Sequence, residues 1–75
     1  MHDYPILEAQ MLLSGCTRKA LAAGLHMHYN TLCRKLRGEM PFTLDEAFSI
    51  KARLQTDLPL EALFERRASQ DKQGN

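Results

Sequence analysis

The chain has 75 residues, of which 44% are hydrophobic, with a formal net charge of +1 and two cysteines. One small domain buries roughly 60% of its unfolded surface, which leaves little room for an enclosed active site, so we expect a binding protein and not an enzyme. The apolar runs are far shorter than the ~20 residues of a membrane-spanning helix, and Met1–Pro5 lacks the basic-then-apolar order of a signal peptide. Two cysteines are too few for a disulfide framework. These three features together favour a cytoplasmic location.

The apolar residues recur with a helical period, and no stretch alternates long enough to predict a strand. The first helix is expected to begin near Pro5 and to end at Gly15. Its predicted apolar face comprises Ile6, Leu7, Ala9, Met11, Leu12 and Leu13. A second helix is expected to follow the N-cap Thr17 and to run to about Ala23. The residues of this segment that should point inward are Leu21, Ala22 and Leu25.

A third helix is expected over about 28–37, with Leu32 and Leu36 as its apolar stripe and Gly38 at its end. The second helix is too short to be stable alone, so it must pack against the third. The small side chain of Ala22 lets the two helices cross closely.

Pro41 prevents the third helix from continuing, and Phe42 is expected to plug the core beneath the loop. Thr43 and Glu46 have the spacing of a capping box, which predicts the start of a fourth helix. The candidate core residues of that helix are Leu44, Ala47, Phe48, Ile50 and Leu54.

Asp57 is expected to cap a fifth helix that has Pro59 in its first turn. The predicted inner face of that helix comprises Leu60, Leu63 and Phe64. Residues 68–75 are polar and are expected to form a disordered tail. The predicted domain therefore covers residues 1–67.

Positive charge is concentrated in residues 17–38, where every charged residue is basic: Arg18, Lys19, Arg34, Lys35 and Arg37. With 10 bases and 9 acids in all, the rest of the chain has five bases against nine acids, a formal charge of −4. A positive face on a two-helix unit is typical of proteins that bind nucleic acid.

Packing the second helix on the third leaves one face of the third helix pointing outward. The residues on that face are Tyr29, Asn30, Cys33, Arg34 and Arg37. In the major groove of B-DNA, Arg34 is able to bond a guanine edge through two hydrogen bonds, and Asn30 an adenine edge in the same way.

Five segments carry a resemblance to a known family: Leu21-Ala22, Thr31-Leu-Cys-Arg-Lys-Leu-Arg-Gly38, Phe42-Thr-Leu-Asp-Glu-Ala47, Ile50-Lys51 and Leu63-Phe64. Over about residues 6–65 the chain resembles the phage repressor and Cro-like helix-turn-helix regulators. The resemblance implies an all-α, lambda-repressor-like bundle of five short helices with a helix-turn-helix.

The resemblance also implies roles for individual residues. Arg18 matches the position that holds phosphate, and the positions that read bases are matched by Tyr29, Asn30 and Arg34. The outward face adds Cys33 to the base-reading set. Further phosphate contacts are expected from Lys19, His28, Lys35 and Arg37.

The turn between the second and third helices departs from the family. Where these regulators usually have glycine, this chain has His26, and a glycine stands two residues earlier at Gly24. Two alternatives are open: His26 adopts a left-handed conformation, which histidine does more often than most residues, or Gly24 ends the second helix early.

We therefore expect a sequence-specific double-stranded DNA-binding protein, a transcriptional regulator (repressor) of phage or prophage type. A homodimer is expected, because one module contacts few bases and dimers bind half-sites about 34 Å apart. The guess for its interface is Leu60, Leu63 and Phe64. The alternative is a protein-interaction module, an antitoxin or adaptor that uses the same fold and docks a partner through the fifth helix.

The cysteines and histidines do not predict a metal site. The spacing of Cys16, His26, His28 and Cys33 matches no common zinc pattern. No catalytic constellation or glycine-rich phosphate loop is present either, so no metal, cofactor or small-molecule substrate is expected.

Overall fold

The computed structural model describes residues 3–66, which form helices and no strand. The helices are α1 (Pro5–Ser14), α2 (Arg18–Gly24), α3 (Tyr29–Leu36), α4 (Leu44–Leu54) and α5 (Leu60–Leu63). The predicted all-α fold with five short helices is therefore confirmed. The predicted tail at 68–75 lies outside the described residues. Between residues 3 and 66, no helix is long and apolar enough to cross a membrane.

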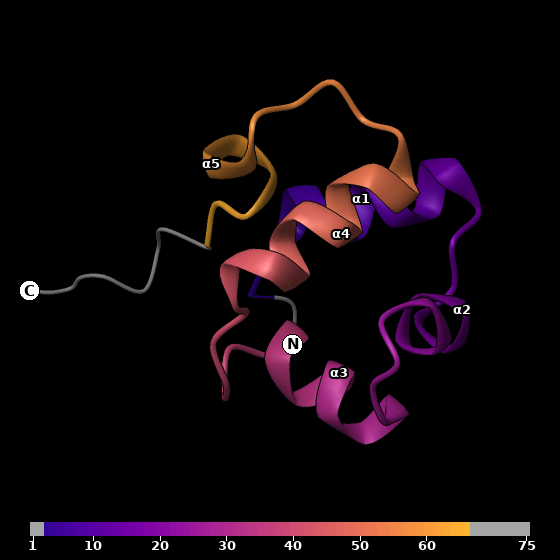
Figure 1. Cartoon of the computed structure of the whole chain (residues 1–75). Helices are drawn as coiled ribbons and strands as arrows, with labels where there is room; N and C mark the ends of the chain where they lie inside the picture. Colours follow the sequence, from indigo (N-terminus) through magenta and orange to yellow (C-terminus); the bar gives the residue numbers. More distant parts are fainter. Residues whose placement is uncertain (1–2, 67–75) are drawn as a thin grey trace, which may run out of the picture.

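The helices are arranged in two groups that meet in the middle of the molecule (Figure 1). α2 packs on α3, and α1 packs on both α4 and α5. In the view of Figure 1, α4 lies in front of α1, and α3 runs along the bottom of the molecule. The radius of gyration is 12.1 Å.

The predicted starts of α2 and α4 are confirmed by their hydrogen bonds. Thr17 accepts a hydrogen bond from the amide of Ala20 at 3.1 Å. At the start of α4, the Thr43 hydroxyl accepts from the Glu46 amide at 3.1 Å, and the Glu46 carboxylate accepts from the Thr43 amide at 2.9 Å. Both arrangements satisfy amides that lack a partner inside the helix.

The predicted cap of the fifth helix is wrong. The N-cap residue of α5 is Pro59, and no side chain caps this helix. The helix begins after Pro59 because the backbone there is still extended, with ψ 158°. Asp57 is exposed two residues earlier.

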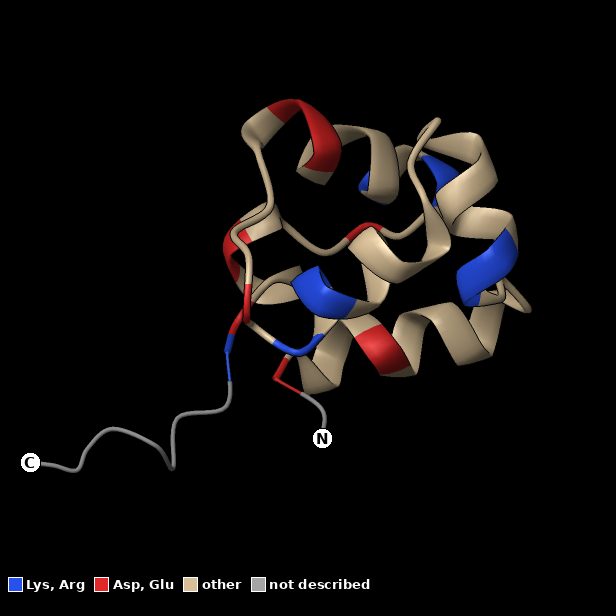
Figure 2. Cartoon of the chain, turned by 90° about the horizontal axis from the view of Figure 1, so that it is seen from below, with Lys and Arg blue, Asp and Glu red and all other residues tan. Residues whose placement is uncertain are grey.

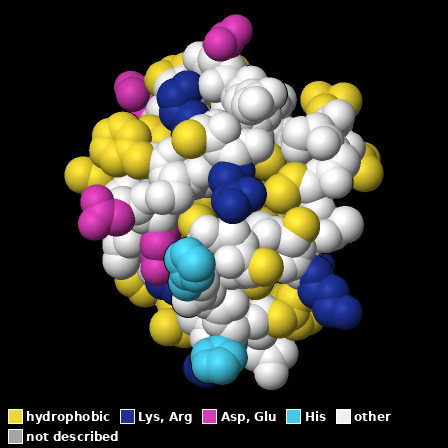
Figure 3. Space-filling view, turned by 45° about the vertical axis from the view of Figure 1, so that its right-hand side comes forward, with side chains coloured by type: hydrophobic (Ala, Val, Ile, Leu, Met, Phe, Trp, Pro, Cys, Tyr) yellow, Lys and Arg dark blue, Asp and Glu magenta, His cyan; other side chains and the backbone are white. Residues whose placement is uncertain are grey.

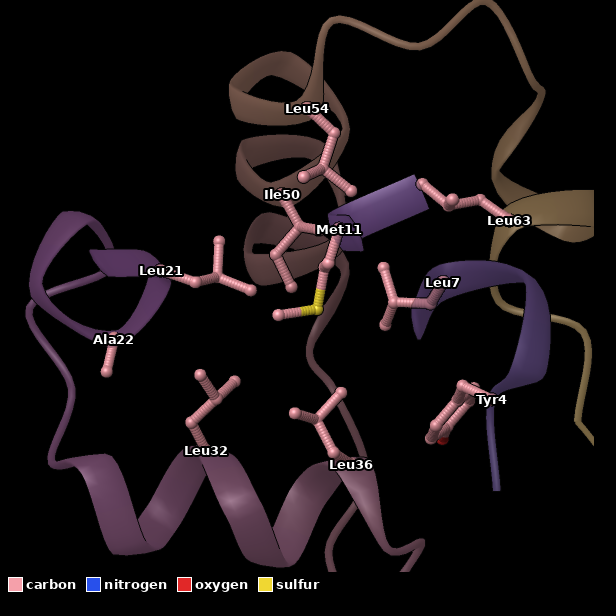
Figure 4. Packing of buried hydrophobic residues seen from close by; sticks show 10 residues of the cluster. All are labelled: Tyr4, Leu7, Met11, Leu21, Ala22, Leu32, Leu36, Ile50, Leu54 and Leu63. Carbon is pink, nitrogen blue, oxygen red and sulfur yellow. The ribbon is translucent and has the colours of Figure 1, made fainter. Parts of the chain in front are cut away.

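The core collects side chains from every helix (Figure 4). Met11 lies among Leu7, Leu21 and Ile50 in the centre of this view, with Leu32 pointing up from α3. The complete cluster comprises Tyr4, Leu7, Met11, Leu21, Ala22, Leu32, Leu36, Ile50, Leu54 and Leu63. Burial of these side chains supplies the main stabilisation of so small a fold.

The predicted apolar face of the first helix is only partly correct. Leu7 and Met11, four residues apart, are buried, whereas Leu12 and Leu13 are 83% and 79% exposed. A helix turns by about 100° per residue, so the stripe that carries Leu7 and Met11 turns the two leucines away from the core. Ala9 is also exposed.

The fourth helix shows the same kind of difference. Ala47, Ile50 and Leu54 are buried as predicted, but Leu44 is 67% and Phe48 55% exposed. The buried residues recur at spacings of three and four and form a stripe along the helix. Leu44 and Phe48 lie on one flank of this stripe. Their predicted place in the core is wrong.

An aromatic cluster closes the fold next to α5. The ring centroid of Phe42 lies 5.4 Å from that of Tyr4 and 5.2 Å from that of Phe64, both in edge-on contact. The prediction that Phe42 plugs the core is confirmed. Leu63 is 0% exposed and belongs to the core, so its predicted place at a dimer interface is wrong. Leu60 and Phe64 are half-buried.

Candidate nucleic-acid interface

The turn between α2 and α3 depends on the backbone of His26. This residue has φ 56°, in the left-handed region, whereas Gly24 is the last residue of α2 and does not have a positive φ. The first of the two alternatives that the sequence left open is therefore the one observed. Two hydrogen bonds hold the turn, from the His26 amide to the Ala23 carbonyl at 3.1 Å and from the Met27 amide to the Ala22 carbonyl at 2.9 Å.

This backbone leads to a testable expectation about stability. We expect His26→Gly to raise the free energy of unfolding by about 0.5 kcal/mol, because glycine relieves the left-handed strain but adds entropy to the unfolded chain. His26→Val should lower it by about 1–2 kcal/mol, because a β-branched residue is strained there. Urea denaturation measures both changes, with His28→Val, at φ −65°, as the control. Equal stability of the glycine and valine variants would contradict the assignment.

The third helix turns a polar face outward. Leu32 and Leu36 point from α3 into the core (Figure 4). On the opposite side, Asn30, Arg34 and Arg37 are exposed. The remaining members of the predicted outward face flank this row: Tyr29 is 46% exposed and Cys33 is half-buried with a free thiol. The structure thus brings all of these residues to one side of α3.

A carboxylate that the sequence analysis did not consider lies beside this row. Glu39 accepts from Arg34 Nε at 3.4 Å and from Arg37 Nε at 2.9 Å. The hydrogen bond from Arg37 lowers the pKa of Glu39, and the same bond raises the pKa of Arg37. The hydrogen bonds to Glu39 orient both guanidinium groups. Because such exposed ion pairs are weak, the two groups remain accessible to another partner.

Arg18 is held in a similar way at the start of α2. Its Nη2 donates to both carboxylate oxygens of Glu8, at 3.0 and 3.3 Å. This hydrogen bond raises the pKa of Arg18. α2 packs on α3, and Cys33 and Tyr29 lie close enough to Arg18 to contribute to its raised pKa, so the start of α2 lies beside the outer face of α3. The side chain retains 38% exposure.

Lys35 does not lie on this surface, and its predicted contact with phosphate is wrong. The residue is 6% exposed, and its ammonium donates to the Pro41 carbonyl and to Glu46 Oε1, each at 2.9 Å. The ammonium also lies 5.9 Å from the centre of the Phe42 ring. Position 35 is three residues after the buried Leu32 and therefore lies beside the buried stripe of α3. Its side chain links the end of α3 to the capping box of α4.

Glu46 shares its carboxylate between two helices. Burial acts to raise the pKa of Glu46, but the hydrogen bonds from the Thr43 amide and from Lys35 outweigh it, and the pKa is lowered. The charged form of this carboxylate is therefore favoured by the folded structure.

Lys19 and His28 complete the predicted phosphate contacts, and both are exposed. Seen from below, the basic segments of α2 and α3 lie on the face in view (Figure 2), and both histidines of the turn are exposed on the face shown in Figure 3. Three of the four exposed or partly exposed cations pair with carboxylates, Arg18 with Glu8 and both Arg34 and Arg37 with Glu39. With Lys19, the four cations and two carboxylates have a formal charge of 4 − 2 = +2. We call these four cations together with Tyr29, Asn30, His28 and Cys33 the α2–α3 surface.

The other candidate groups do not assemble into a site. Among residues 3–66, no three or more His, Cys, Asp and Glu side chains are grouped so that they could hold a metal ion. Neither protein-family models, nor curated proteins, nor solved structures give a match to this chain.

Proposed function

We propose that the protein binds double-stranded DNA in a sequence-specific manner and regulates transcription, as a repressor of phage or prophage type, with α2 and α3 as a helix-turn-helix. The observation that supports this most is the exposed row of Asn30, Arg34 and Arg37 on α3, beside Arg18 at the start of α2. A helix with such side chains on its outer face fits the major groove, which is about 12 Å wide.

The proposed mechanism divides the α2–α3 surface into two parts. Arg34 and Asn30, on the outer face of α3, read base edges through paired hydrogen bonds, with Tyr29 and Cys33 contacting neighbouring bases. Phosphate contacts come from Arg18, Lys19, His28 and Arg37, and they fix the position of α3 on the duplex without reading sequence. A phosphate that replaces Glu8 or Glu39 as the partner of a guanidinium exchanges one charge-assisted hydrogen bond for another, so the energy gained is the difference between the two bonds.

Arg18 provides a prediction about salt dependence. We expect Arg18→Ala to weaken binding to all duplexes alike and to reduce the slope of log K against log salt concentration by about one, because one phosphate contact is lost. The control is Lys51→Ala, which removes a cation of α4 whose ammonium donates to the Thr56 carbonyl at 2.8 Å. Titrations at several salt concentrations measure the slope; an unchanged slope for Arg18→Ala would remove this residue from the phosphate contacts.

Selection of bound duplexes from a random pool tests the proposed function as a whole. The expected result is a consensus of two half-sites spaced by about one helical turn, about 34 Å. A pool without enrichment after several rounds, with folded protein, would refute sequence-specific binding.

The low net charge of the α2–α3 surface favours a second candidate function, that of an antitoxin or adaptor that binds another protein. Glu8 and Glu39 reduce the +4 of its cations to +2. A heparin column with a salt gradient separates the two candidates, since a protein that binds the phosphate backbone is retained to higher salt than an adaptor.

A further inference from the structure

Glu39 is fixed in place by the way α3 ends. Arg37 is the C-cap residue of the helix, and Gly38 follows it with φ 82°, in the left-handed region. The Gly38 amide donates to the Lys35 carbonyl at 3.0 Å, and the Glu39 amide donates to the Arg34 carbonyl at 2.9 Å. These two hydrogen bonds form a Schellman motif, which satisfies the last carbonyls of a helix. The backbone of Glu39 is therefore bonded to the same residue whose guanidinium its carboxylate contacts.

A contact from elsewhere in the fold also holds this turn. The ion pair of Asp3 with Arg66 lies directly against Gly38, and a Cβ atom built on Gly38 would collide with both side chains. The turn that positions Glu39 is thus held from two sides, by its own hydrogen bonds and by the ion pair that packs on it.

The Glu39 carboxylate uses a different oxygen for each arginine. Oε2 accepts from Arg37 Nε at 2.9 Å, a distance typical of a charge-assisted hydrogen bond. Oε1 accepts from Arg34 Nε at 3.4 Å, which is a longer and weaker contact. Arg37 therefore holds the carboxylate, and the carboxylate in turn orients Arg34. The lowered pKa of Glu39 agrees with this order, because its largest cause is the hydrogen bond from Arg37 and the bond from Arg34 contributes less.

A contact through Nε leaves the end of the Arg34 guanidinium for another partner. A guanidinium has five N–H donors, one on Nε and four on the two terminal nitrogens. A guanine edge offers two acceptors, N7 and O6, that bond two of these donors at once. With Nε directed at Glu39, the two terminal nitrogens of Arg34 are left for this paired contact, and the side chain is 57% exposed.

We propose that Glu39 determines the specificity of DNA binding: it is a positioning residue that holds Arg34 in the orientation that reads a guanine edge, and its negative charge lowers the affinity for duplexes of every sequence. The inference rests on the proposed function, because it assigns a role within the site that binds DNA. A guanidinium that is oriented before binding loses less conformational entropy when it meets the base. The charge of Glu39 opposes the phosphates of operator and random duplex alike, so the base contact alone distinguishes the two.

Glu39→Gln tests the proposal through two changes of opposite direction. The neutral amide orients Arg34 less firmly, so the preference for the selected operator over one altered at the guanine should fall about two- to fivefold, the range of an exposed ion pair. Loss of the negative charge should raise the affinity for random duplex. A variant that is only less stable loses affinity for both duplexes. Glu61→Gln, on α5, which packs on α1 and α4, is the control and should change neither quantity.

A second substitution tests whether Glu39 acts through Arg34. In a protein that carries Arg34→Ala, the further change Glu39→Gln should leave the preference for the operator unchanged, because the side chain to be positioned is absent. The affinity for random duplex should still rise. Thermal melting confirms that each variant is folded. The same loss of preference from Glu39→Gln with and without Arg34 would overturn the positioning role.

A measurement without DNA separates this inference from the proposed function. In NMR spectra of the free protein, Glu39→Gln should shift the Nε–H resonances of Arg34 and Arg37. It should not shift that of Arg53, whose guanidinium lies against Gly24 on α2. An unchanged Arg34 resonance, or an unchanged preference for the operator, would overturn the role of Glu39 and leave DNA binding by the wild type intact. A wild-type protein that enriches no sequence would instead refute the proposed function, and this role with it.

Discussion

Replacing Arg34 by alanine is expected to weaken binding of a selected operator by about ten- to hundredfold, with far less effect on random duplex, because one paired hydrogen-bond contact to a base edge is worth about 1–3 kcal/mol. The structure places Arg34 on the outer face of α3, opposite the buried Leu32 and Leu36. Its only ion pair within residues 3–66 is the exposed contact with Glu39, which a base edge is able to replace.

The lysine variant makes this prediction sharper. Arg34→Lys keeps the positive charge but loses the planar fork that bonds two acceptors together. If Arg34 reads a base, the lysine variant should lose specificity almost as the alanine variant does, while retaining affinity for random duplex. Titration of both variants on operator and random duplex measures the ratio. An equal loss on the two duplexes would instead assign Arg34 to the phosphate contacts.

Replacing Glu46 by glutamine is expected to lower the free energy of unfolding by about 2 kcal/mol at pH 7, because the nearly buried ammonium of Lys35 loses its carboxylate partner. The Thr43 amide also loses a charged acceptor, which weakens the capping box of α4. Both hydrogen bonds end on the same oxygen, Oε1, so a single substitution affects the end of α3 and the start of α4 together.

The effect of Glu46 depends on pH with a definite sign. Its pKa is lowered in the folded state, so the carboxylate stabilises the fold fully above its ordinary value of 4.5 and loses this contribution as the pH falls below that value. Urea denaturation of both proteins from pH 7 to pH 3 should therefore show the difference shrinking in acid. Asp45→Asn, on the same helical turn but exposed, is the control and should cost less than about 0.5 kcal/mol. A difference that stays constant over this range would contradict the assignment.

Local signals predicted the end of α1 and the starts of α2 and α4. Thr17, Thr43 and Gly15 act through hydrogen bonds or backbone angles of residues close by in the sequence, so spacing alone is sufficient to identify them. The outward face of α3 was predicted for a similar reason, since Leu32 and Leu36 determine which side of a short helix is buried.

The features that were not predicted depend on contacts between distant parts of the chain. Nothing local distinguishes Phe48 from Ile50, because the crossing of α4 with α1 and α5 decides which flank is covered. Lys35 reaches a carboxylate 11 residues away, and Glu8 meets Arg18 across 10 residues. The sequence therefore overestimated the positive charge of the α2–α3 surface. Segment 17–38 contains no acidic residue, and the carboxylates near this surface come from outside that segment.

The ion pair between Asp3 and Arg66 brings the two ends of the described fold together, 63 residues apart in the sequence. Arg66 also lies against the ring of Tyr4, with its Cζ 5.5 Å from the ring centroid. Ends that lie this close make circular permutation geometrically inexpensive. A short connection between residues 3 and 66 would allow new termini to be opened in the α4–α5 loop, with the α2–α3 surface left untouched.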